Sequence, residues 1–275
     1  MFHCGRFRFA LTRPLVMGVL NVTPDSFSDG GCYGTVGKAV ARARQMMDEG
    51  AAIIDVGGES TRPGAAPVTQ REERRRVLPV VEALVALSIP VSVDTRQPLV
   101  MQAAIAAGAD MINDISALQT EDALRQIAEA NVAVCLMHMR GTPSTMQREP
   151  HYRDVVAEVM GYLAARLAVA EAAGIGRERL VADPGFGFCK NLAHNLTLLR
   201  HLSRFRALGV PLLAGLSRKS MLGQLTGRSV ADRLPASLAA ALAAVAQGAN
   251  IVRVHDVAAT RDAVMVWRAV EEAGE

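Results

Sequence analysis

Short apolar runs alternate with longer amphipathic segments along this chain, and most of the runs end in polar residues. The first run covers residues 15–20 and gives way at Asn21 to a loop of hydroxyl, carboxylate and glycine residues. A short run bounded in this way is typical of a buried strand. Strands are therefore predicted over residues 15–20, 52–56, 90–93, 111–112, 132–137, 180–182, 211–214 and 251–254.

The segments between these runs carry apolar residues at helical spacing. Thr69 and Glu72 are spaced as a capping box, which predicts a helix from this point to about Leu87. Gly50 follows the end of the first predicted helix, where glycine is a common stop. Further helices are predicted over residues 37–49, 121–130, 152–173, 191–207 and 231–247, with others that end at Gly108 and at the C-terminus.

Eight strand–helix units in strict alternation imply a parallel sheet. In a chain of 275 residues they predict an α/β fold, a closed (β/α)8 TIM barrel that forms a single domain over residues 1–275. Residues 3–13 alternate weakly and predict a short N-terminal hairpin that plugs one end of the barrel. The alternative is a doubly wound open sheet, but the glycine-rich phosphate loops that mark the nucleotide-binding folds are not present.

The composition excludes several classes of protein. Half of the residues are hydrophobic, which suffices for a large core, and a net charge of +3 is too small to indicate a nucleic-acid partner. Cys4, Cys32, Cys135 and Cys189 lack the spacing of a metal site, and nothing in their arrangement indicates disulfides. No run reaches the roughly 18 apolar residues of a membrane span. We therefore expect a cytoplasmic protein with neither a membrane nor a nucleic-acid partner.

Charged and amide side chains follow almost every predicted strand. In a (β/α)8 barrel the active site lies at the C-terminal ends of the strands, so these side chains are expected to converge on one mouth. A single aspartate in such a position is more commonly a helix cap, and the alternative for the whole set is that its members pair with one another. The residues are Asn21, Asp55, Asp94, Asn113, Asp183, Lys219, Arg253 and His255.

The chemistry of this set suits one kind of ligand. Two carboxylates and an amide match a flat heterocycle with a fork of N–H donors, since a carboxylate accepts both donors of such a fork. Lys219 is available for the carbonyl oxygen of the ring. Arg253 and His255 lie at the end of the eighth strand, where barrels often hold phosphate. Residues 217–220 open a helix whose free N–H groups suit an anion. The residues alone therefore indicate an enzyme of a polar heterocycle with an anionic group.

Eight motifs spread over roughly residues 15–256 resemble the dihydropteroate synthase family. They are LNVTPDSFSDGG, DVGGESTRPGA, SVDT, MINDIS, LMHMRGTPSTMQ, DPGFGFCKNLAHN, GLSRKSM and IVRVHDV. The resemblance implies a (β/α)8 barrel, usually a homodimer, that acts as a transferase in folate biosynthesis. It implies that 6-hydroxymethyl-7,8-dihydropterin pyrophosphate is condensed with p-aminobenzoate, with Mg²⁺, to give 7,8-dihydropteroate and pyrophosphate, and that sulfonamides compete with p-aminobenzoate.

The resemblance also implies a role for each matched residue. Asn21 is expected to bind the Mg²⁺, and Asp29, Arg62 and Lys219 are expected to take part in catalysis. The residues expected to hold the pterin pyrophosphate are Thr61, Asp94, Asn113, Asp183, Lys219, Arg253, His255, Met137 and Ile115. The p-aminobenzoate pocket is expected to contain Phe27, Pro63, Phe188 and Ser220.

One site position departs from the family pattern, because Cys189 stands where glycine is common. Two other functions compete with the main interpretation. A corrinoid-linked methyltetrahydrofolate methyltransferase shares the pterin cradle but does not need the loop motifs around Asp29 and Arg62, and both are intact. A catalytically silent pterin-binding paralogue is expected to have lost one of these loops or Arg253 or His255, and neither loss is present.

Overall fold

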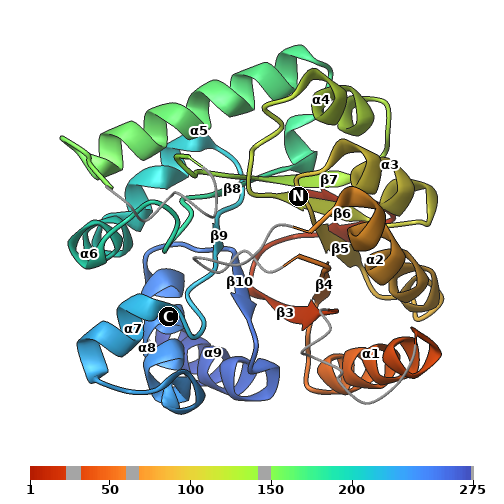
Figure 1. Ribbon diagram of the computed structural model, residues 1–275. Coiled ribbons are helices and arrows are strands. Elements are labelled where there is room, and N and C mark those ends of the chain that lie inside the picture. The colour runs from red at the N-terminus through yellow and green to blue at the C-terminus, as the bar shows by residue number, and fades with distance from the viewer. Residues whose placement is uncertain (23–31, 60–67, 142–149, 274–275) are drawn as a thin grey trace.

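Eight parallel strands form the centre of the molecule, and helices surround them (Figure 1). The computed structural model describes residues 1–22, 32–59, 68–141 and 150–273. In the order of the chain the strands are β3 (Leu15–Asn21), β4 (Ile53–Gly57), β5 (Val91–Asp94), β6 (Met111–Asp114), β7 (Ala133–Met137), β8 (Leu180–Asp183), β9 (Leu213–Ala214) and β10 (Ile251–Val254).

The sheet closes on itself. Its strands are paired in the order β8-β7-β6-β5-β4-β3-β10-β9, and a parallel bridge between Ala182 and Leu212 joins the two ends. The amide of Ala182 donates to the carbonyl of Pro211 at 2.9 Å across this junction. The predicted (β/α)8 barrel is therefore confirmed, and the doubly wound alternative is wrong because its sheet would have two open edges.

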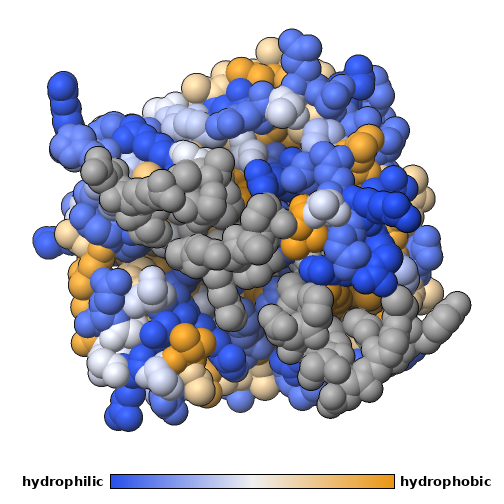
Figure 2. Space-filling view, viewed as in Figure 1, coloured by the Kyte–Doolittle hydropathy of each residue, from blue (hydrophilic) through white to orange (hydrophobic). Residues whose placement is uncertain are grey.

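Helices follow the strands and cover the outside of the barrel. Figure 2 shows that hydrophilic residues dominate the helices on the face seen in Figure 1, with hydrophobic residues in smaller groups. The helices are α1 (Cys32–Asp48), α2 (Gln70–Val85), α3 (Pro98–Ala106), α4 (Glu121–Ala128), α5 (Val155–Ala172), α6 (Leu192–Arg200), α7 (Ser220–Thr226), α8 (Leu234–Ala246) and α9 (Val257–Glu272). No helix among the described residues is both long and apolar enough to cross a membrane.

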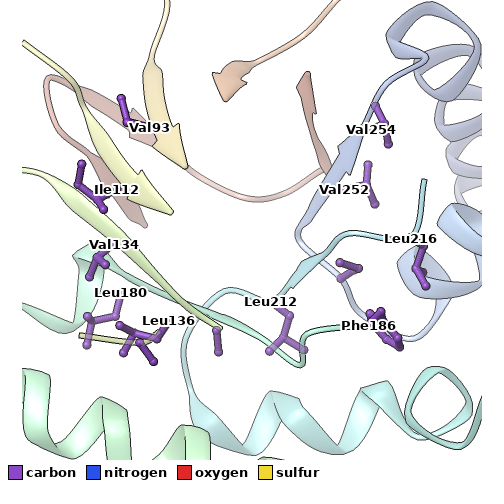
Figure 3. Packing of buried hydrophobic residues seen from close by; sticks show 14 of the residues in the cluster. Val93, Ile112, Val134, Leu136, Leu180, Phe186, Leu212, Leu216, Val252 and Val254 are labelled. Carbon is purple, nitrogen blue, oxygen red and sulfur yellow. The ribbon is translucent and has the colours of Figure 1, made fainter. Parts of the chain in front are cut away.

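Side chains alternate between two buried layers along each strand, as the pleat requires. On β6, Met111 belongs to a core inside the barrel, and Ile112 belongs to the core between barrel and helices. Figure 3 shows that outer layer, with Val93, Ile112, Val134, Leu180 and Val252 among its members. The inner layer fills the barrel below the strand ends and comprises Leu15, Met17, Ile53, Met111, Ala133, Cys135, Val181, Leu213 and Ile251, together with Phe2 and Cys4.

The N-terminal hairpin closes the other end of this inner layer. Its strands β1 (Phe2–Cys4) and β2 (Phe7–Phe9) are antiparallel. Between them, Arg6 pairs with the buried Asp110, from Nε to Oδ1 at 2.9 Å and from Nη2 to Oδ2 at 3.0 Å. The predicted plug is therefore confirmed, and an ion pair holds it against the start of β6.

Several helix boundaries differ from the prediction. The segment predicted as one helix over residues 191–207 consists of α6 and a 3₁₀ helix, Leu202–Leu208. The capping box at the start of α2 is only half formed. Thr69 Oγ1 accepts from the amide of Glu72 at 3.3 Å, but the Glu72 carboxylate pairs with Arg75 and Arg76 instead of turning back to the cap. Helical spacing indicated the covered face but not these ends, as is usual for helix boundaries.

Candidate active site

The inward-facing register places the polar residues of the strand ends directly above the inner apolar layer. Ile53, Met111 and Ile251 point into the barrel, so the residue two positions further along each strand points inward as well. Those residues are Asp55, Asn113 and Arg253. The same rule applies to Asp183, two positions after Val181, and to Met137, two positions after Cys135. Strand geometry therefore explains why separate motifs meet at one place.

Arg253 lies at the centre of this group. Its Nε donates to Asp55 Oδ2 at 2.6 Å, and its Nη2 donates to Asp94 Oδ2 at 2.8 Å. Asn113 Nδ2 donates to the same Asp55 oxygen at 3.3 Å. The alternative in which charged residues of the mouth pair with one another is thus correct for Arg253, Asp55 and Asp94.

The two carboxylates differ in how they are enclosed. Asp55 is fully buried, and its Oδ1 has no hydrogen-bond partner within the described part of the chain. Burial raises the pKa of Asp94 to about 7, and the Arg253 cation acts in the opposite direction. For Arg253 burial lowers the pKa, but Asp55 and Asp94 outweigh it and raise the pKa above its usual range. The Arg253 guanidinium therefore keeps its charge, and Asp94 is the partner whose protonation state can change near neutral pH.

Lys219 brings a second cation to the site. Its Nζ lies 4.3 Å from the centre of the Phe188 ring and makes no hydrogen bond to any residue that the structure describes. Burial lowers the pKa of Lys219 to about 8, and the nearby Asp183 opposes this shift. Burial also raises the pKa of Asp183, whose Oδ1 accepts from the amide of Gly185 at 2.7 Å. Acceptors on Asp94 and Asp183 and a donor on Lys219 thus face a common space.

His255 is oriented by a residue that sequence reasoning did not assign to the site. Ser217 Oγ lies 3.0 Å from His255 Nδ1 and accepts from the His255 amide at 3.2 Å. The neighbouring Arg218 pairs with Asp256 through two contacts of 3.0 Å and 2.5 Å. These contacts tie the loop after β9 to the end of β10. The only sequence signal was the motif that contains Ser217 and Arg218.

An apolar patch adjoins the charged group. It contains Ile115 and Met137, which were predicted to pack against the pterin, with Phe188, Met139 and Cys189. Cys189 has φ of +50°, in the left-handed region where residues other than glycine are strained. This conformation explains why glycine suits the position. The cysteine side chain is buried in the patch beside Phe188.

Ser220, predicted for the p-aminobenzoate pocket, is the exposed first residue of α7. It lines a cavity of about 620 Å³ together with His151, Lys190 and Asn191. Asn21 ends β3, and its Oδ1 and Asp94 Oδ2 both approach Gly57, where an added Cβ would lie 3.6 Å and 3.9 Å from them. The remaining predicted site residues, Phe27, Asp29, Thr61, Arg62 and Pro63, lie outside the described residues.

The pairing of Arg253 with Asp55 predicts that loss of the Arg253 cation strongly lowers the stability of the folded protein. Replacing Arg253 by Met leaves a buried carboxylate without its cation, which costs about 3–5 kcal/mol of the free energy of unfolding. Adding Asp55→Asn removes the buried charge and is expected to restore much of this loss. Arg268→Met, which breaks an exposed pair with Glu272, serves as the control and should cost less than about 1 kcal/mol.

Urea denaturation of the three variants measures these differences. A double variant no more stable than Arg253→Met alone would contradict the account of the pair.

Comparison with known proteins places this site in a family. A model of the family described as pterin binding enzyme matches residues 17–255. A dihydropteroate synthase of Neisseria meningitidis serogroup C is 52% identical over 275 residues, which cover 98% of this chain and 97% of that protein.

Solved structures of dihydropteroate synthases are similar to this chain in both sequence and fold. Dihydropteroate synthase of Xanthomonas albilineans with 4-aminobenzoic acid is 56% identical, with a TM-score of 0.89, and the match covers 95% of this chain and 94% of that one. Burkholderia cenocepacia dihydropteroate synthase complexed with 7,8-dihydropteroate is 50% identical, with a TM-score of 0.91, and the match covers 99% of this chain and 97% of that one. The chain therefore belongs to the dihydropteroate synthase family of pterin-binding enzymes and is a transferase.

Proposed function

We propose that this chain condenses 6-hydroxymethyl-7,8-dihydropterin pyrophosphate with p-aminobenzoate to give 7,8-dihydropteroate and pyrophosphate. The observation that carries the proposal is the ammonium of Lys219, which lies near Asp94 and Asp183 and has no hydrogen-bond partner for its Nζ among the described residues. The relatives with 4-aminobenzoic acid and with 7,8-dihydropteroate are consistent with this assignment.

The pterin ring fits the upper part of the barrel. Its amino group and ring N–H groups donate to the carboxylates of Asp94 and Asp183, and the Asn113 amide contacts a ring nitrogen. Its carbonyl oxygen accepts from Lys219. Met137 and Ile115 pack against its faces. The carboxylates need donors from the ligand, because the Asp94 side chain is only 10% exposed and the Gly185 amide is the one donor on Asp183 Oδ1 among the described residues.

Arg253 has to change partners when the substrate enters. If Asp94 turns to the N–H donors of the ring, Arg253 Nη2 is released to the pyrophosphate while Nε stays on Asp55. His255, held by Ser217, binds the same anion, with Thr61 and Arg62 from the second loop. A guanidinium suits this role because it binds phosphate oxygens through a planar fork of donors.

The described residues offer few ligands for a metal ion by themselves. Within the described residues no group of three His, Cys, Asp or Glu side chains could hold one. Mg²⁺ is usually bound by one or two protein oxygens together with substrate phosphates. The side-chain oxygen of Asn21, at the end of β3, suits that arrangement. When bound there with the pyrophosphate, Mg²⁺ neutralises the charge that builds on the leaving group.

The reaction requires little acid–base chemistry from the protein. The C–O bond of the pterin methylene breaks, and its electron pair leaves with the pyrophosphate, which Arg62, Arg253 and His255 stabilise. Asp29 stabilises the delocalised pterin cation. The neutral amine of p-aminobenzoate then forms the new C–N bond and loses a proton to solvent. Phe27, Pro63, Phe188 and Ser220 hold this second substrate in line, which supplies a large part of the acceleration.

We propose further that the chain acts as a homodimer. The outer face of α9 exposes Met265, Val266 and Val270, which are each more than half accessible. Neighbouring exposed apolar residues of this kind mark interaction surfaces. Sedimentation velocity gives the oligomeric state directly.

The proposed reaction is tested by pyrophosphate release from the dihydropterin pyrophosphate with Mg²⁺, with and without p-aminobenzoate. We expect release that depends on p-aminobenzoate and yields dihydropteroate. Pterin binding without turnover would favour the silent paralogue instead, and methyl transfer from methyltetrahydrofolate would favour the methyltransferase.

Lys219 gives a second prediction, because its hydrogen bond to the pterin carbonyl is stronger when the amine is protonated. Lys219→Ala is expected to weaken pterin binding by about 1.5–3 kcal/mol, the worth of a hydrogen bond to a charged group. Its pKa of about 8 in the free enzyme means that wild-type affinity falls as the pH rises above this value. The variant should lose this fall. Calorimetry at several pH values checks both effects, and an unchanged affinity in the variant would remove Lys219 from the site.

A further inference from the structure

A second lysine lies close to the site but is used in a different way. Lys190 is 3% exposed and forms no ion pair with any described residue. Its Nζ lies 2.9 Å from each of three acceptors: the carbonyl oxygens of Gly185 and Phe188 and the Nδ1 of His138. An ammonium has three N–H donors. Burial lowers the pKa of Lys190 to about 7, and the nearby Asp183 opposes this shift. In the protonated form all three donors are taken.

His138 completes this set as a neutral acceptor. It is 1% exposed and follows β7 directly. Burial lowers the pKa of His138 to about 3, and the Lys190 cation adds to the effect. The neutral ring that accepts from the Lys190 ammonium at Nδ1 carries its proton on Nε2. Its edge contacts Tyr162, with the ring centres 4.9 Å apart, which fixes its orientation.

The turn between Asp183 and Lys190 is wound around this ammonium. Gly185, Gly187 and Cys189 all have positive φ, between +50° and +80°. Alternating residues in this conformation turn the carbonyls of Gly185 and Phe188 toward Lys190. At Gly185 a side chain is not possible, because an added Cβ would lie 2.0 Å from the carbonyl oxygen of His138. Cys189 is the strained residue of this turn, and the two bonds from Lys190 to the carbonyls of Gly185 and Phe188 offset that strain.

The two site residues on this turn do not depend on Lys190 equally. Asp183 is the last residue of β8, and its carbonyl accepts from the His138 amide at 2.9 Å, so the sheet holds it in place. Phe188 lies five residues further along. The carbonyl of Phe188 is held by Lys190, and its ring lies under the Lys219 ammonium.

We propose that Lys190, with His138 as its third acceptor, is a positioning residue that fixes Phe188 for the second substrate. The proposal rests on the proposed function, since it assigns Phe188 to the p-aminobenzoate pocket. Because the three donors of its ammonium are taken, Lys190 acts through the turn that it holds.

Lys190→Met tests this role, with Lys38→Met as the matched control on the exposed face of α1. We expect Lys190→Met to lower kcat by about 10–100-fold, the effect of a misplaced substrate, and to raise the KM for p-aminobenzoate. Pterin affinity measured by calorimetry should change little, because Asp94, Asn113, Asp183 and Lys219 remain. Lys38→Met should match the wild type.

A second pair of variants guards against misfolding of Lys190→Met. His138→Asn keeps an acceptor near the position of Nδ1, whereas His138→Leu removes it. We expect His138→Asn to keep most of the activity and His138→Leu to show the same rise in KM for p-aminobenzoate as Lys190→Met. Thermal unfolding of each variant shows that the measured protein is folded.

The possible outcomes are distinct. An inactive wild type would contradict the proposed function itself. If the wild type is active, wild-type kinetic constants in folded Lys190→Met would overturn the positioning role, as would equal kinetic losses in His138→Asn and His138→Leu. A lowered melting temperature with unchanged kinetic constants would show that Lys190 serves stability alone, which also overturns it.

Discussion

The structure of the site depends on one guanidinium held between two carboxylates inside the barrel mouth. Arg253 contacts Asp55 at 2.6 Å and Asp94 at 2.8 Å. Removing charges from water is costly, and only close pairing offsets that cost. Asp55 is fully buried, so it has to keep its cation. The Asp94 side chain is 10% exposed and lies nearer the mouth, so it is the carboxylate that can exchange Arg253 for a ligand with N–H donors.

The barrel makes this arrangement possible by separating two layers along the same strands. Met111 and Ile251 belong to an apolar layer that the N-terminal hairpin closes, and Asn113 and Arg253 follow in the same inward register. The apolar floor keeps water from the lower side of the ion pairs. Since the strands are fixed by their neighbours in a closed sheet, the polar side chains above them are positioned without help from a ligand.

The barrel and the position of its polar mouth are predictable from the sequence because both follow from strand periodicity. The apolar runs locate the strands, and a closed parallel sheet brings the residues that follow them, such as Asp94 and Arg253, to one mouth. What the sequence does not reveal depends on local backbone geometry. The contact of Ser217 with His255 and the three hydrogen bonds of Lys190 depend on the directions of carbonyl groups and ring nitrogens. The sequence does not give these directions. A buried lysine without a carboxylate partner has no signature in the sequence, and neither does the left-handed conformation of Cys189.

The exchange of partners by Arg253 is the central claim, and a crystal structure with bound dihydropterin pyrophosphate tests it most directly. We predict that Arg253 keeps its contact with Asp55, that Asp94 accepts hydrogen bonds from the pterin ring, and that the released guanidinium nitrogen binds the pyrophosphate. A complex in which Arg253 and Asp94 remain paired as they are without ligand, with the ring bound elsewhere, would contradict it.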